Sequence, residues 1–173
     1  MRKRIPTAFL WNGSKVYMLN LILPNIPPHE HYVEPFMGTA VVFFNKPPVK
    51  SSTLNDIDGN IVNFFRVLQD RAKAAELLRR LRYTPYAREE YRKAALLLSS
   101  QRAIDDITRA WAFFVAQNMS IIHSYYADPY GRNWGYSRDV RQNLPASVYI
   151  NKIKNLVRIA DALRYCQLEN KDG

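Results

Sequence analysis

One glycine and one aspartate, 18 residues apart, are the residues of this chain whose types and spacing point most directly to chemistry. Gly38 follows a short extended run, residues 31–34, and precedes an apolar stretch, residues 39–45, that is typical of a helix. A glycine at such a turn lets the backbone approach a ligand, and the N–H groups of the helix start point toward that ligand. Asp56 follows a second predicted strand, residues 52–55, where a carboxylate can accept hydrogen bonds from ribose hydroxyls. The pattern favours a cofactor that contains adenosine, and an ordinary strand–helix turn is the alternative.

The elements that must position these two residues follow from the apolar periodicity and the prolines. Residues 14–23 predict a short helix, and the prolines at 24, 27 and 28 end it. Apolar residues recur at helical spacing over 61–68. Residues 31–69 therefore alternate strand, helix, strand and helix, which predicts a parallel α/β unit whose strands all end on one edge.

The second half of the chain has the pattern of helices instead. Residues 72–81 predict one helix, and Thr84 before Pro85 predicts the N-cap of the next one. Residues 103–119 predict a third helix, and a last helix begins at Pro145. Residues 165–169 look like a strand that returns to the sheet. The helical region is thus an expected insertion between two pieces of one α/β domain.

The positive charge is concentrated in that insertion. The chain has 25 Lys and Arg against 15 Asp and Glu, a formal charge of +10. Residues 79–158 hold 14 of these cations and 6 of the anions, a net charge of +8, whereas the rest of the chain has a net charge of +2. Such a surplus suits the phosphates of a nucleic acid. A solvated helical surface that happens to be basic is the alternative.

Other function classes find no support in the composition. The 173 residues include one cysteine, Cys166, which has no partner in the chain for a disulfide. The three histidines lack the spacing of metal ligands, and neither a P-loop nor a Ser/His/Asp grouping occurs. No apolar run approaches 18 residues, and the basic N-terminus lacks the apolar core of a signal peptide. We therefore expect a cytoplasmic protein without a membrane partner.

The chain resembles the Dam-type N6-adenine-specific DNA methyltransferases in three segments that occur in the family's order. They are Phe-Leu-Trp-Asn-Gly-Ser-Lys at 9–15, Val-Glu-Pro-Phe-Met-Gly at 33–38 and Leu-Asn-Asp-Ile at 54–57. Thr84, Pro85, Tyr86 and Tyr91 also resemble the early part of that family's insertion. The resemblance implies S-adenosyl-L-methionine (SAM) as the cofactor and double-stranded DNA as the substrate. It also implies a Rossmann-like sheet, incomplete here, with an inserted helical DNA-recognition subdomain. The resemblance further implies a bacterial, archaeal or phage-encoded protein.

The resemblance assigns the first motifs to the SAM site. It implies that Trp11 and Lys15 belong to this site, and that Glu34, Phe36 and Gly38 line its methionine and adenosine ends. A core tryptophan and a solvated lysine are the alternatives for Trp11 and Lys15.

The later motif positions would hold the adenosine. Asp56 would bind the ribose and Ile57 would touch the adenine ring, while Asp172 resembles the acidic position that meets the adenine after the third strand. A plain surface aspartate is the alternative for Asp172. Ala40 departs from the family, because many relatives carry glycine there.

The family's catalytic motif, Asp-Pro-Pro-Tyr, does not occur in these 173 residues. Asp128-Pro129-Tyr130 is similar, but it has one proline, no preceding apolar strand and a place in the basic region, so we interpret it as a turn. No catalytic residue is therefore assigned, and that motif is expected beyond Gly173. We expect the chain alone not to methylate DNA, and a second polypeptide with the motif to be a possible partner.

Residues 123–143 interleave aromatic residues with arginine and asparagine, a composition that suits contacts with phosphates, base edges and a flipped base. Packing of the aromatic rings on the helices is the alternative, and both roles are compatible. The candidate DNA-binding residues are Tyr126, Arg132, Asn133, Trp134, Arg138 and Arg141.

The sequence thus predicts three parts. Residues 1–78 form the SAM-binding part, residues 79–151 the DNA-recognition insertion, and residues 152–173 the returning helix and strand. The expected function is methyl transfer from SAM to adenine N6 at a specific site in duplex DNA. A truncated or split DNA-binding module without activity of its own, and another nucleotide-binding α/β protein, are the alternatives.

Overall fold

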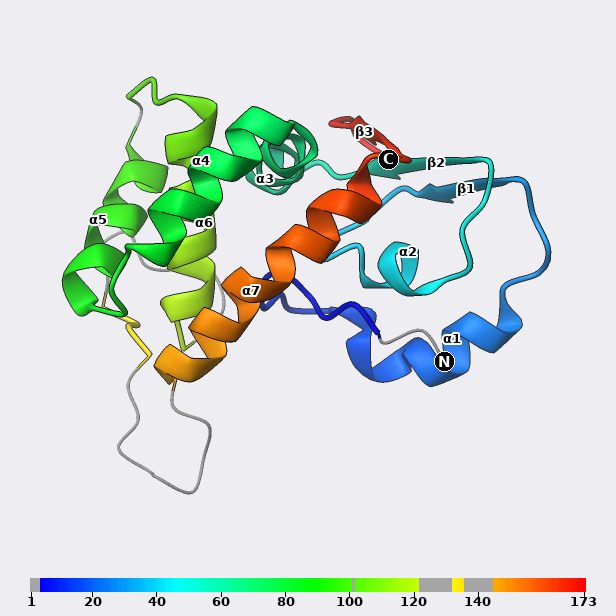
Figure 1. Cartoon of the computed structure of the whole chain (residues 1–173), viewed down its shortest axis with the longest axis horizontal. Coiled ribbons are helices and arrows are strands. Elements are labelled where there is room, and N and C mark those ends of the chain that lie inside the picture. Colours follow the sequence, from blue (N-terminus) through cyan, green and yellow to red (C-terminus); the bar gives the residue numbers. More distant parts are fainter. Residues whose placement is uncertain (1–3, 101, 122–131, 136–144) are drawn as a thin grey trace.

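A computed structural model of the chain describes residues 4–100, 102–121, 132–135 and 145–173. In the described part, three strands form one sheet in the order β1-β2-β3, and all neighbouring strands are parallel. Figure 1 shows this sheet at one end of the molecule, α4, α5 and α6 at the other, and α7 running diagonally between them. The strands are β1 (His31–Glu34), β2 (Ser51–Asn55) and β3 (Gln167–Glu169).

Short helices and turns surround the sheet, and longer helices make up the rest. A 3₁₀ turn (Lys15–Met18) leads into α1 (Leu19–Ile22) and a second 3₁₀ turn (Leu23–Asn25), and α2 (Val41–Asn45) joins β1 to β2. The longer helices are α3 (Gly59–Gln69), α4 (Arg71–Arg82), α5 (Arg88–Ser99), α6 (Asp106–Met119) and α7 (Pro145–Leu163). The chain is therefore a mixed α/β protein with a small parallel sheet, as the alternation of patterns predicted.

Aspartates begin three of the long helices. The carboxylates of Asp58, Asp70 and Asp105 accept hydrogen bonds from backbone N–H groups in the first turns of α3, α4 and α6. Such caps satisfy donors that have no partner inside the helix. Asp70 lies between α3 and α4 in an extended conformation, so the chain changes direction there.

The prediction that a helix begins at Thr84-Pro85 was wrong, because α5 begins at Arg88. The Thr84 hydroxyl instead donates to the Arg80 carbonyl at the end of α4 (2.8 Å) and accepts a hydrogen bond from Trp111 Nε1 (2.8 Å). Trp111 is buried on α6, 27 residues farther along the chain. Thr84 thus serves the packing of α4 on α6, not the start of α5.

We expect Thr84→Val to lower stability, because it leaves the buried Trp111 N–H without its acceptor. The loss is about 1–2 kcal/mol, which corresponds to a decrease in Tm of roughly 3–6 °C for a chain of this size. Thr84→Ser keeps the hydroxyl and is the matched control. Thermal unfolding followed by circular dichroism measures both, and equal Tm values for Thr84→Val and wild type would contradict this role.

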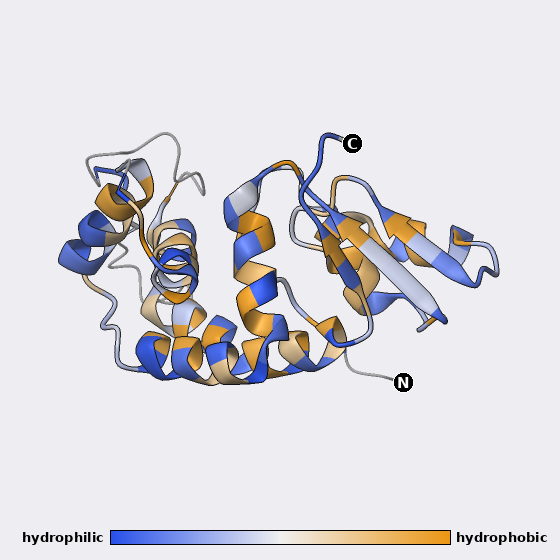
Figure 2. Cartoon of the chain, turned by 90° about the horizontal axis from the view of Figure 1, so that it is seen from above, coloured by the Kyte–Doolittle hydropathy of each residue, from blue (hydrophilic) through white to orange (hydrophobic). Residues whose placement is uncertain are grey.

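One continuous cluster of buried residues joins the sheet to the helices in the described part of the chain. It includes Leu54 of β2, Phe64 of α3, Phe113 of α6 and Leu156 of α7. Figure 2 shows apolar and polar residues alternating around the helices, so that each long helix has an apolar side for this core. Helix α7 is continuous across residue 151. The division into three parts stays a prediction.

The N-terminal segment is held by its aromatic residue and by helices far along the chain. Phe9 is fully buried, and its ring packs edge-on against the rings of Phe64 (5.7 Å between centroids) and Phe113 (4.9 Å). Gln117 of α6 donates a hydrogen bond to the Leu10 carbonyl (2.5 Å). These contacts fix the position of the next residue, Trp11, whose ring also meets that of Phe9.

None of the helices in the described residues is both long enough and apolar enough to cross a lipid bilayer.

Candidate functional site

A pocket of about 290 Å³ lies at the carboxyl ends of β1 and β2. It collects residues from four places in the sequence: the segment before the first 3₁₀ turn, the end of β1, the loop into α2 and the end of β2. Six of the residues predicted for the SAM site line it. They are Trp11, Lys15, Glu34, Phe36, Gly38 and Asp56.

Gly38 forms the close approach that its sequence position predicted. Its φ is +47°, in the left-handed region that side chains disfavour, and a Cβ there would lie 3.4 Å from Cδ1 of Trp11. Its N–H donates to Oδ2 of Asp56 (2.8 Å). The backbone loop after β1 is therefore joined directly to the carboxylate after β2.

The Asp56 carboxylate organises the second half of the pocket. Besides the bond from Gly38, its Oδ1 accepts a hydrogen bond from the Asp58 N–H (3.0 Å). Each carboxylate oxygen has two lone pairs, so both oxygens can still accept a hydrogen bond from a ligand hydroxyl. Asp56 is half-buried, and it lines the pocket.

Glu34 is held by the strand and the helix on either side of it. Its Oε1 accepts hydrogen bonds from the hydroxyl of Tyr32 (2.6 Å) and from the N–H of Phe43 in α2 (3.0 Å). Burial raises the pKa of Glu34, although these two hydrogen bonds and the positive charges of Lys15 and Lys46 act in the opposite direction. The pocket thus contains a carboxylate whose protonation depends on its burial, on these two hydrogen bonds and on the two nearby lysines.

The departure at Ala40 has a structural meaning. Ala40 adopts φ +50° and ψ +27°, the left-handed conformation, immediately before α2. Glycine takes this conformation without the steric cost that a Cβ brings. Ala40 is fully buried, so its methyl group packs inside the protein at this strained position.

Two of the residues predicted for the adenine end do not line the pocket. The side chain of Ile57 is 66% exposed, and Asp172 is exposed near the end of the chain. The segment that carries Asp172 does lie beside the pocket edge. Asn170 donates to the Asp56 and Ile57 carbonyls (2.8 and 3.1 Å), and Gly173 lies against the ring of Phe36.

The sequence reasoning missed several pocket residues. Tyr32, which holds Glu34, lies two positions earlier on the same face of β1, a relation that strand alternation could have shown. The Ser14 and Thr39 hydroxyls lie 3.1 Å apart and join the two loops. The other lining residues lie within the predicted motifs or a few positions beyond them, and they are Asn12, Gly13, Met37, Val41 and Val42.

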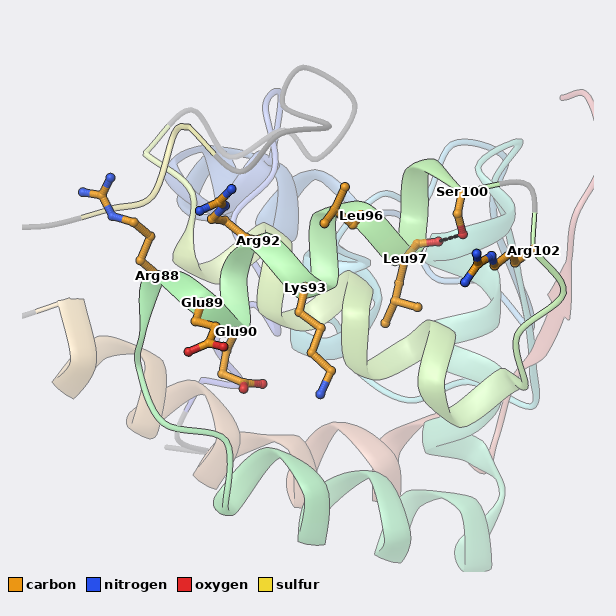
Figure 3. Close-up of a pocket in the computed structure, with 9 residues that line it drawn as sticks. All are labelled: Arg88, Glu89, Glu90, Arg92, Lys93, Leu96, Leu97, Ser100 and Arg102. Atoms are coloured by element: carbon orange, nitrogen blue, oxygen red, sulfur yellow. Dashed lines mark hydrogen bonds between the residues drawn. The ribbon is translucent and has the colours of Figure 1, made fainter.

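A second candidate functional surface lies along the outer side of α5. This helix packs on α6 through Tyr91, Ala94 and Ala95, which are buried. Its outer side lines a broad hollow that contains four exposed cations, two glutamates and two leucines. Figure 3 shows the cations spread from the start of the helix to just past its end. They are Arg88, Arg92, Lys93 and Arg102.

The residue that follows α6 pairs with one of the candidate DNA-binding residues. Ser120 and Trp134 form an antiparallel bridge, with hydrogen bonds from Ile121 N to the Asn133 carbonyl (2.9 Å) and from Gly135 N to the Met119 carbonyl (2.6 Å). A Cβ on Gly135 would lie 3.1 Å from Met119 O, so a side chain there would be crowded by the paired backbone.

Only three of the candidate DNA-binding residues belong to the described part of the chain. Arg132 is exposed and Asn133 is half-buried. The ring of Trp134 lies 5.9 Å from that of Tyr86 and 5.1 Å from the guanidinium of Arg88. Trp134 therefore has a packing role, and contact with DNA stays a prediction. The candidates Tyr126, Arg138 and Arg141, and the Asp128–Tyr130 turn, lie outside the described residues.

Within the described ranges, no three His, Cys, Asp or Glu side chains gather closely enough to hold a metal ion.

Comparison with known proteins agrees with this geometry. The model of the D12 class N6 adenine-specific DNA methyltransferase family matches residues 11–171. A DNA N-6-adenine-methyltransferase of Escherichia phage P1 is 30% identical over 107 residues, which is 62% of this chain. The match spans 14% of the length of that phage protein.

Proposed function

Because the chain belongs to the D12 class of N6 adenine-specific DNA methyltransferases, we propose that it binds SAM and duplex DNA for methyl transfer to adenine N6. The observation that carries the proposal is the joining of the Gly38 loop to Asp56 inside one pocket. The family is generally SAM-dependent. We propose further that the three strands belong to a Rossmann-like methyltransferase sheet, that residues 79–151 form the DNA-recognition part, and that the protein works in the cytoplasm.

The residues of the pocket fit SAM by their chemistry. Asp56 has lone pairs left for ribose hydroxyls, and Gly38 leaves open the space that a Cβ would fill against Trp11. Phe36, 67% exposed, offers an apolar surface for the adenosine. The cofactor supplies a methyl group on a positively charged sulfonium, and the carboxylate of Glu34 favours a cation in this pocket.

Glu34 should make SAM binding depend on pH. Ionised Glu34 attracts the SAM cation and protonated Glu34 does not, and burial keeps the neutral form to a higher pH than in an ordinary glutamate. SAM affinity should therefore fall as the pH is lowered through the raised pKa of Glu34. Calorimetric titration at several pH values tests this. Glu34→Gln can still accept both hydrogen bonds, and it should flatten the profile; an unchanged profile in this variant would contradict the role.

The base-binding chemistry needs the family's Asp-Pro-Pro-Tyr motif, which does not occur among these 173 residues. Flipping an adenine out of the duplex costs a few kcal/mol. The amino group must also be held against the methyl group, and such orientation makes a large contribution to the rate. In the family this is the role of Asp-Pro-Pro-Tyr. We propose that a segment with this motif, in the same or a second polypeptide, completes the site.

Transfer of tritiated methyl groups from SAM to a mixed-sequence duplex tests the whole proposal. We expect no incorporation with these 173 residues alone and incorporation when a polypeptide with Asp-Pro-Pro-Tyr is added. Incorporation by the chain alone that disappears with Asp128→Ala would show that Asp128-Pro129-Tyr130 is the catalytic motif. Absence of SAM binding by calorimetry would contradict the proposal at its first step.

A further inference from the structure

We propose that a second pocket, at the amino-terminal edge of the sheet, binds the phosphate of a nucleotide. This pocket has a volume of about 660 Å³, which is within the range of sites for small molecules, about 300–1,000 Å³. Its walls come from α2, from the loop between α2 and β2, and from the C-terminal end of α7. It lies on the opposite edge of the sheet from Glu34 and Asp56, although Lys46, which lines it, also acts on the charge of Glu34.

The charges that line this pocket are those of an anion site. Four cations line it, Lys46, Lys50, Arg158 and Arg164, against the single carboxylate of Asp161. Two of these cations form weak ion pairs. The Nη2 atom of Arg164 lies 3.7 Å from Oδ1 of Asp161. Lys50 pairs with Glu30, and the side chains of both residues are about three-quarters exposed. Guanidinium and ammonium groups together favour a phosphate over a less highly charged anion.

Lys46 gives the strongest indication of a ligand. It is 4% exposed, and an ammonium is costly to bury unless it has partners. Burial lowers the pKa of Lys46, and the charge of Glu34 partly opposes this effect. Its Nζ donates one hydrogen bond, to the Pro47 carbonyl (3.0 Å), and lies 4.4 Å from the centre of the Tyr32 ring. An ammonium has three N–H donors, so Lys46 can also donate to an anion in the pocket that it lines.

The apolar walls suit the rest of a nucleotide. Tyr165 is 78% exposed at the pocket, and Phe43 is half-buried beside it. Bases stack on such aromatic faces with little regard to their identity. Pro47 and Pro48 add rigid apolar surface. The same phosphate chemistry occurs in a free nucleotide and in the backbone of a DNA strand, and the experiment separates these two sources.

Calorimetric titration of the full chain with pyrophosphate and with thymidine monophosphate tests the site. Thymidine monophosphate is chosen because it lacks adenosine, the group expected in the SAM pocket. We expect both to bind, and the double variant Lys50→Glu/Arg164→Glu to weaken both at least about tenfold, because two attractions become repulsions. Lys154→Glu is the control, since Lys154 is exposed on α7 and does not line the pocket. Circular dichroism checks that each variant is folded.

The outcomes decide the proposal and the source of the phosphate. Displacement of thymidine monophosphate from the wild-type chain by a DNA duplex would assign the pocket to a DNA strand, and absence of displacement would assign it to a free nucleotide. No binding at millimolar concentration, or an equal effect of Lys154→Glu, would overturn the proposal. Unchanged pyrophosphate binding in folded Lys46→Met would overturn it as well.

Discussion

Replacement of Asp56 by alanine is expected to weaken SAM binding by roughly 10- to 150-fold. A hydrogen bond to a charged group contributes about 1.5–3 kcal/mol, and its loss gives an effect of this size. The structure adds a second reason. Asp56 Oδ2 also accepts the Gly38 N–H (2.8 Å), so alanine releases the loop that forms the opposite wall of the pocket. We therefore expect the loss to lie toward the upper end of the range.

Calorimetry with SAM measures this effect, and two further variants define its cause. Asp56→Asn keeps one oxygen acceptor but loses the charge, and it should show an intermediate loss. Asp106→Ala removes an exposed carboxylate at the start of α6, far from the pocket residues in sequence, and should leave SAM affinity unchanged. Equal affinity of wild type and Asp56→Ala would remove Asp56 from the SAM site.

The second large effect is expected at the outer side of α5. If this surface follows a DNA backbone, Arg92→Gln/Arg102→Gln should weaken duplex binding roughly 100-fold at low salt, because two charge-assisted contacts are lost. The slope of log affinity against log salt should also become shallower by about 2, since each neutralised phosphate contributes about 0.9. Both side chains are exposed, and the variant should not disturb the packing of α5 on α6.

Fluorescence anisotropy with a labelled duplex at several salt concentrations gives both quantities. Arg4→Gln/Arg71→Gln removes the same charge from two residues outside the basic region 79–158, and it is the matched control. A similar loss in the control would mean that the total charge, not α5, attracts the DNA. The contact of Arg88 with Trp134 connects α5 to the pair of Ser120 and Trp134, so this test also bears on the residues predicted from the aromatic composition.

The elements that position the pocket could be predicted because their signals are local. Residues 31–34 and 51–55 are short extended runs between breaks, and α3 shows its apolar face within 11 residues. The turn at Gly38 and the acid at Asp56 could be placed for the same reason, since the carboxyl ends of parallel strands lie on one edge. The family resemblance assigned eight residues to the SAM site, and six of them line the pocket. Binding of SAM by these residues remains a prediction.

The features that escaped prediction depend on residues far apart in the sequence. The start of α5 was misplaced because Thr84 is engaged by Trp111, 27 residues later. The pairing of Ser120 with Trp134 joins residues in a part of the chain for which the sequence predicts no strand. The phosphate pocket combines α2 with the end of α7, about 120 positions away, and no pattern in either segment alone indicates it.

The anchoring of the N-terminal segment has a consequence for how the protein is made. The carbonyls of Leu10 and Ala8 accept hydrogen bonds from the side chains of Gln117 and Asn118, more than 100 residues later. During synthesis, Trp11, Gly38 and Asp56 therefore leave the ribosome well before α6, the helix that holds the segment next to Trp11. Contacts of such long separation form slowly, and exposed apolar surface in the interval invites association with other chains. The pocket at the carboxyl ends of β1 and β2 can therefore take its final form only after α6 has been synthesised.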